Sequence, residues 1–94
     1  MFTTDESRID EAISKHLKTW WTFETKQEIE LNYGIAVLNQ IISIYDFASQ
    51  SEFWLSLELE DAYNLAVERL KEQYPFLSDD SVRRIANMAA YSWK

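Results

Sequence analysis

The chain has 94 residues, with one Gly, one Pro and no Cys, and 47% of its residues are hydrophobic. So few turn-forming residues exclude a many-stranded β-sandwich or barrel, and the lack of Cys excludes disulfide scaffolds and zinc fingers. Sixteen acidic residues against nine basic ones give a formal net charge of −7, the wrong sign for holding nucleic acid through Lys and Arg. We expect residues 1–94 to form a single domain.

A first helix is predicted from about Asp5 to about Trp20. Thr3 and Glu6 have the capping-box spacing, in which each side chain satisfies a free backbone N–H of the other. The side chains that then recur every three or four positions on one face are Ile9, Ala12, Ile13, His16, Leu17 and Trp20.

The N-terminal region also bears on localisation. Asp5, Glu6 and Asp10 stand where a secretory or mitochondrial signal would be basic and poor in acids. The longest mostly apolar stretch, residues 35–45, is much shorter than the ~20 residues that span a bilayer. We therefore expect a cytoplasmic protein that does not bind membranes.

The sequence of residues 25–34 is compatible with either a helix or a strand. Thr25 and Glu28 repeat the capping-box spacing, yet polar and apolar residues alternate from Glu28 to Tyr33 as in a half-buried strand. Helix is favoured, because a single short strand would have no partner for its backbone groups.

The next segment, residues 35–48, predicts a central and largely buried helix. Its apolar side chains surround most of the circumference. They are Ile35, Val37, Leu38, Ile41, Ile42, Ile44, Tyr45 and Phe47.

A further helix is predicted from about Leu59 to Gln73. Helix-start signals occur at Ser49 to Glu52 and again at Ser56, so residues 53–55 are expected to form a short lead-in turn. The helix should end near Gln73, because the residue before Pro75 is pushed out of helical geometry.

The last helix has the clearest start. Ser78 can cap it, Asp79 and Asp80 fall in its first turn, and Leu77 has the spacing to pack on Val82. The chain is therefore predicted to be all-α, a compact bundle of four or five helices packed either antiparallel or orthogonally.

Catalytic and metal-binding patterns are lacking. His16 is the only histidine. Ile13 stands three residues before it, and Ala12 and Trp20 stand four residues away, so no Glu-x-x-His or His-x-x-x-His spacing exists. His16 is expected to be a boundary residue that is only packed or solvated. The acidic clusters match neither a calcium loop nor a glycosidase pair. We expect no enzyme, no cofactor and no metal; a carboxylate-dependent enzyme is the weakest alternative.

A turn and helix over residues 75–87 could suggest DNA binding through Arg83 and Arg84. The first turn of that helix carries Asp79 and Asp80, where a recognition helix would approach phosphates. Direct nucleic-acid binding is therefore not expected, and the two arginines are expected to pair with nearby acids.

The negative charge is concentrated in residues 24–61. This segment holds eight acidic residues and one basic residue, Lys26, for a net charge of −7. It is bracketed by Trp20, Trp21 and Phe23 on one side and by Phe53 and Trp54 on the other. Adjacent aromatics on a helix point about 100° apart, so at least one of each adjacent pair should be exposed or at a boundary.

Exposed aromatics with an acidic rim are typical of a surface that binds a basic protein. The residues predicted to bind a partner are Trp21, Phe23, Glu24, Glu28, Glu30, Glu52, Trp54, Glu58, Glu60 and Asp61.

The leading hypothesis is a small inhibitor that forms a 1:1 complex with a basic protein. Most concretely, it would be a bacterial immunity protein, or antitoxin, that masks the active site of a cationic nuclease-type toxin. One alternative is a homo-oligomeric structural or adaptor module joined through exposed aromatics. Another is a phage-encoded inhibitor of a nucleic-acid-binding defence protein.

Overall fold

The computed structural model describes residues 4–17, 22–50, 54–55 and 58–92. The described helices are α1 (Thr4–His16), α2 (Phe23–Tyr33), α3 (Ile35–Ala48), α5 (Leu59–Gln73) and α6 (Asp79–Ser92), and no strand occurs in these ranges. The predicted all-α class is confirmed. Residues with sequence-based roles that lie outside the described ranges are Thr3, Trp20, Trp21, Glu52, Phe53 and Ser56.

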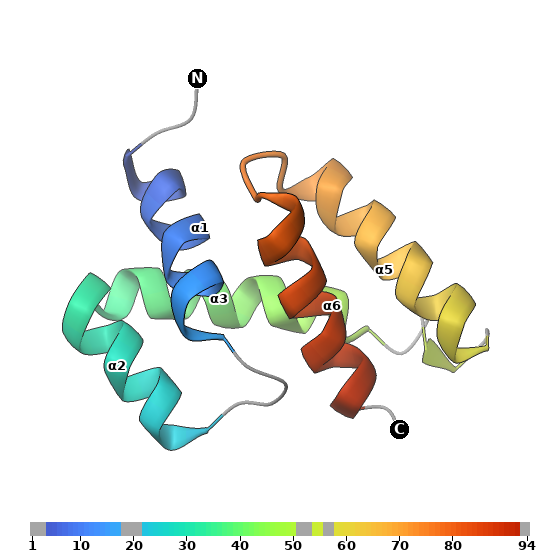
Figure 1. The fold of residues 1–94 in the computed structure, drawn as a ribbon, viewed down its shortest axis with the longest axis horizontal. Coiled ribbons are helices and arrows are strands. Elements are labelled where there is room, and N and C mark those ends of the chain that lie inside the picture. Colours follow the sequence, from blue (N-terminus) through green and yellow to red (C-terminus); the bar gives the residue numbers. More distant parts are fainter. Residues whose placement is uncertain (1–3, 18–21, 51–53, 56–57, 93–94) are drawn as a thin grey trace.

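Helix α3 lies at the centre of the arrangement. It contacts α1, α2, α5 and α6, as the sequence predicted for a central helix. Figure 1 shows α1 and α6 side by side and crossing α3, while α2 and α5 lie toward its two ends. Because α1 and α6 cross α3, the arrangement is not a simple antiparallel bundle in which all helices run along one another.

The core is formed by one face of each helix. In α3 the buried side chains Leu38, Ile41 and Ile44 meet the neighbouring helices. Alanines on α1, α5 and α6 leave room for close helix packing. The fully buried residues outside α3 are Ala12, Ile13, Leu17, Ile29, Ala62, Ala66, Leu70, Ser81, Val82, Ile85, Ala86, Met88 and Ala89.

Helix α1 ends earlier than predicted. It stops at His16 rather than near Trp20, and the backbone N–H of Leu17 makes a last helical bond to the carbonyl of Ile13 at 3.1 Å. The carbonyl of Leu17 accepts a hydrogen bond from Nη1 of Arg84 at 2.7 Å. The end of α1 is thus bonded to Arg84, 67 residues later in the chain, and the local sequence around residues 16–20 does not predict this contact.

The doubtful stretch is helical. Helix α2 begins at Phe23, and its cap is Thr22 rather than Thr25: the Thr22 Oγ1 accepts from the backbone N–H of Thr25 at 3.0 Å. The preference for helix over residues 25–34 is therefore confirmed, with Gly34 outside the helix.

The later boundaries agree closely with the prediction. Helix α5 spans Leu59–Gln73, and α6 begins at Asp79 after Ser78, whose Oγ accepts from the backbone N–H of Ser81 at 3.2 Å. Ser49 does not start a helix but ends α3, since its N–H bonds to the carbonyls of Asp46 and Tyr45.

Gly34 makes the turn between α2 and α3. Its N–H closes α2 on the carbonyl of Glu30 at 2.9 Å, and its own carbonyl accepts from the N–H of Leu38 at 3.2 Å. Its backbone has φ 94° and ψ 163°, a region that only glycine adopts readily. A Cβ at this position would meet nothing within 4 Å, so the constraint is conformational rather than steric crowding.

Gly34→Ala is expected to lower the free energy of unfolding by about 1–3 kcal/mol, because alanine is strained in this conformation. Urea denaturation followed by circular dichroism measures the change. Asn39→Ala, at an exposed position of α3, is the control and should change stability by less than about 0.5 kcal/mol. Equal stability of the Gly34→Ala variant and the wild type would contradict this account.

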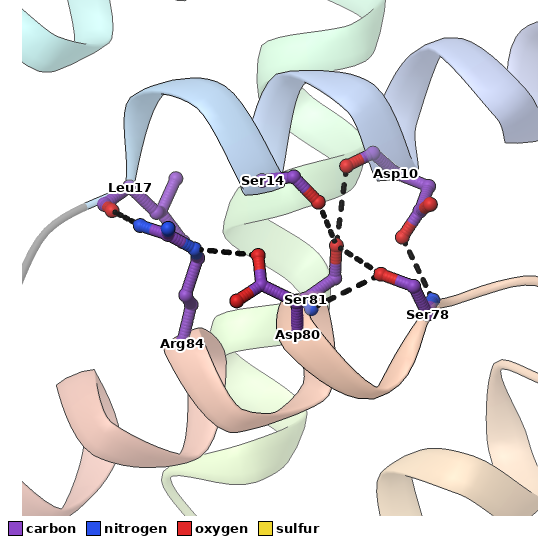
Figure 2. Close-up of polar contacts among 7 residues, drawn as sticks. All are labelled: Asp10, Ser14, Leu17, Ser78, Asp80, Ser81 and Arg84. Carbon is purple, nitrogen blue, oxygen red and sulfur yellow. Dashed lines mark hydrogen bonds and ion pairs between the residues drawn. The ribbon is translucent and has the colours of Figure 1, made fainter.

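A polar network joins α1 to α6 (Figure 2). The Ser81 side chain is fully buried, and its Oγ donates to the carbonyl of Asp10 at 3.1 Å and lies 2.9 Å from the Ser14 Oγ and 3.2 Å from the Ser78 Oγ. The Asp10 carboxylate accepts from the backbone N–H of Ser78 at 2.8 Å. These bonds determine which turn of α6 faces α1.

Arg84 adds an ion pair beside this network. Its Nε lies 2.8 Å from Oδ2 of Asp80, four residues earlier on α6, while Nη1 reaches the end of α1 (Figure 2). The predicted pairing of Arg84 with a nearby acid is confirmed.

Ser81→Ala is expected to lower the free energy of unfolding by about 1–3 kcal/mol, since it leaves buried partners without their hydrogen bonds. Thermal or urea unfolding provides the measurement. Ser43→Ala removes the same hydroxyl from an exposed position of α3 and should have little effect. Similar losses in the two variants would show that the network does not contribute.

Candidate protein-binding surface

The acidic residues predicted to bind a partner lie in two separate places. Glu24, Glu28 and Glu30 are on α2, whereas Glu58 and the pair Glu60 and Asp61 surround the start of α5; all six are exposed. Figure 1 places α2 and the first turn of α5 toward opposite ends of α3. The structure therefore does not join the two clusters into one acidic surface.

Trp54 is not a surface residue. It is only 8% exposed, and its indole N–H donates to the carbonyl of Ala48, the last residue of α3, at 2.7 Å. The prediction that Trp54 takes part in a partner surface is therefore wrong, because its ring packs into the core and closes the α3 end. Two further predicted contacts, Trp21 and Glu52, lie outside the described residues.

The outer face of α2 exposes two large apolar side chains. Phe23 is 74% exposed and Leu31 is 86% exposed. With the exposed Gln27 between them, they follow a four-residue spacing that keeps them on one face over about 12 Å. The buried residues of α2, Thr25 and Ile29, lie on the opposite face and hold the helix to the rest of the domain. We call Phe23, Gln27 and Leu31 the α2 strip.

Carboxylates stand on both sides of the α2 strip. At about 100° per residue, Glu24 and Glu28 fall on one side of the strip and Glu30 on the other. Only Glu24 lies in the first turn, where the helix dipole would favour an acid in any case. The dipole thus does not account for Glu28 and Glu30, although Glu28 has a structural contact with His16.

Leu31 is the residue that sequence analysis missed. It was counted in the alternating pattern of residues 28–33, which would have placed it on the face of a strand. The four-residue spacing of Phe23, Gln27 and Leu31 identifies Leu31 as a neighbour of Phe23 on one face. This spacing can be used only when residues 23–33 are known to be helical.

His16 helps to hold α2 against α1. Its Nδ1 lies 3.2 Å from Oε2 of Glu28, and its ring meets the ring of Tyr33 edge-on with centroids 5.8 Å apart. The polar partner therefore comes from a neighbouring helix, and not from a position four residues away on α1. His16 is half-buried, as expected for a boundary residue, but it is not merely packed or solvated.

Tyr33, the last residue of α2, makes the other contacts to α1. Its hydroxyl donates to Oε2 of Glu11 at 3.1 Å, and its carbonyl accepts from Nη2 of Arg8 at 3.0 Å. Hydrogen bonds from Lys15 and then from Tyr33 lower the pKa of Glu11 below its ordinary value. Burial, followed by the hydrogen bond to Glu11, raises the pKa of Tyr33.

The second acidic cluster has a structural explanation. Glu60 and Asp61 occupy the first turn of α5, where negative charge is stabilised by the helix dipole. Leu55 and Leu59 nearby are 72% and 47% exposed. Because the dipole accounts for these acids, the α2 strip is the better candidate for a binding surface.

Metal-binding and membrane-spanning features are not found in the described ranges. No three His, Asp or Glu side chains there lie close enough together to hold a metal ion. None of the described helices combines the length and apolar character needed to cross a membrane. Comparisons with models of protein families, with curated proteins and with solved structures found no significant match.

Tyr33→Phe is expected to raise the pKa of Glu11 toward its ordinary value, because one hydrogen bond to the carboxylate is lost. A carboxyl pKa that is lowered by folding stabilises the protein above the unfolded-state pKa, and this contribution is lost as the pH falls through the folded-state pKa. NMR titration of the Glu11 carboxyl carbon measures the shift. Tyr63→Phe on α5 is the control, and an unchanged Glu11 titration in Tyr33→Phe would contradict the prediction.

Proposed function

We propose that this protein is an inhibitor that binds a basic protein through the α2 strip and the carboxylates beside it. The observation that carries the proposal is the exposure of Phe23 and Leu31 on a helix face bordered by Glu24, Glu28 and Glu30. In its most concrete form, the protein is a bacterial immunity protein that covers the active site of a cationic nuclease-type toxin.

The apolar and acidic groups have different roles in such a complex. Burial of the Phe23 and Leu31 side chains supplies affinity and slows dissociation. The carboxylates attract a positively charged surface and speed the encounter, an effect that salt weakens. A nuclease presents positive charge where it holds phosphate, so the same surface suits a nucleic-acid-binding defence protein.

A hetero-complex is favoured over self-association. Two copies that met through the α2 strip would bring their own carboxylates together, and like charges at an interface cost binding energy. A basic partner removes that repulsion. The proposed complex is therefore 1:1, and a homodimer through exposed aromatics is the second candidate.

Reversing the charges beside the strip tests the role of α2. The partner is first captured by a pull-down from the source cell. Glu24→Lys with Glu30→Lys is expected to slow association with this captured partner at least about tenfold at low salt. Glu60→Lys with Asp61→Lys is the matched control, since it changes the net charge equally and also alters a first helical turn. Surface plasmon resonance at two salt concentrations measures the rates.

Two results would contradict the proposal. One concerns the association rate, which would either not change with salt or fall equally in the Glu24→Lys/Glu30→Lys and Glu60→Lys/Asp61→Lys variants. The other is capture of the protein alone, with a dimer mass in solution that Leu31→Asp abolishes, which would support the homo-oligomer instead.

A further inference from the structure

A second surface feature, separate from the α2 strip, is a cavity of about 350 Å³. It lies among α1, the first half of α3 and the turn between α5 and α6. Its size falls within the range of pockets that bind small molecules. Its apolar lining consists of Ile9, Ala36 and Val37, and its aromatic lining of Tyr33, Tyr74 and Phe76.

The aromatic wall is held by edge-on contacts. The ring of Tyr74 lies 6.2 Å from that of Phe76 and 5.6 Å from that of Phe47, both nearly perpendicular to it. The Tyr74 hydroxyl is protonated near neutral pH, as in any tyrosine of ordinary pKa, and burial raises its pKa further. Within the described part of the chain this hydroxyl has no hydrogen-bond partner, and it can donate to a ligand.

Arg8 supplies a positioned positive charge at the cavity. Its guanidinium lies 5.7 Å from the centre of the Tyr33 ring, and its Nη2 donates to the Tyr33 carbonyl. Among the described residues no acid lies within ion-pair distance of Arg8, although the protein as a whole is strongly acidic. The remaining guanidinium N–H groups are therefore suited to a carboxylate, which they match in geometry.

The other polar groups limit what the anion can be. Glu6 lines the same cavity and repels negative charge, so only an anionic group that lies against Arg8 is compensated and a further one is disfavoured. The amide oxygen of Gln40, which also lines the cavity, can accept a hydrogen bond from a ligand N–H or O–H. The lining thus suits a molecule with one negative charge and a flat apolar body.

We propose that this cavity binds a small aromatic monocarboxylate, with its ring against Tyr74 and Phe76 and its carboxylate on Arg8. The site does not depend on the proposed inhibitor function, because it uses the face of the domain where α1 and α3 meet and not the α2 strip. An aromatic ring suits walls made of aromatic edges and faces.

The test compares two probes that share a ring system and differ in charge, 2-naphthoate and 2-naphthamide. Each is titrated into the full chain while methyl NMR signals of Ile9, Val37 and Leu31 are followed. We expect saturable shifts at Ile9 and Val37 but not at Leu31. We also expect 2-naphthoate to bind about tenfold more tightly than the amide, the effect of one charged hydrogen bond.

Two variants assign the roles within the cavity. Arg8→Gln should weaken 2-naphthoate about tenfold and leave 2-naphthamide unchanged, so that retained amide binding also reports an intact cavity. Ala36→Phe, at an exposed position of the lining, should weaken both probes by filling the space. Arg69→Gln, an exposed arginine on α5, is the charge-matched control and should weaken neither.

Several outcomes would overturn the proposal. Shifts that do not saturate, or that occur only at Leu31, would show that the cavity is not a site for aromatic acids. Equal affinity for the two probes, or an Arg8→Gln variant that still prefers 2-naphthoate, would refute the role of Arg8.

Discussion

Burial of the α3 side chains holds the other helices in place. Ile41 and Ile44 are almost completely buried, and α3 is in contact with all four other described helices. Each such side chain contributes about 1.5–3 kcal/mol through its removal from water. Helices shorter than about 12–15 residues are marginal on their own in water, so α2, with 11 residues, depends on this packing.

The way α2 is held explains why its outer face is available. Only Thr25 and Ile29 are buried on this helix, and the contacts of His16 with Glu28 and of Tyr33 with Glu11 fasten it to α1. Its outer face therefore has no packing role. Exposed apolar side chains there would promote self-association, and the neighbouring carboxylates oppose it through charge repulsion.

Local signals predicted the fold better than they predicted the surface. The C-terminal end of α5 and the start of α6 follow from Pro75 and Ser78, which act within a few residues of themselves. The end of α1 does not, because Arg84 reaches it from a distant helix. The prediction of Trp54 at a surface failed because it, too, used local sequence only. Whether a ring is buried depends on the tertiary packing around it, which the residues next to it in the chain do not reveal.

The sequence by itself determined that the chain is helical, where most helices begin and end, and that residues 24–61 carry the excess negative charge. These properties depend on composition and on contacts between residues a few positions apart. The tertiary structure alone decided which acids share a surface, since α3 separates the α2 carboxylates from those of α5 (Figure 1). It also created the cavity beside Arg8, because that space is bounded by segments up to about 70 positions apart.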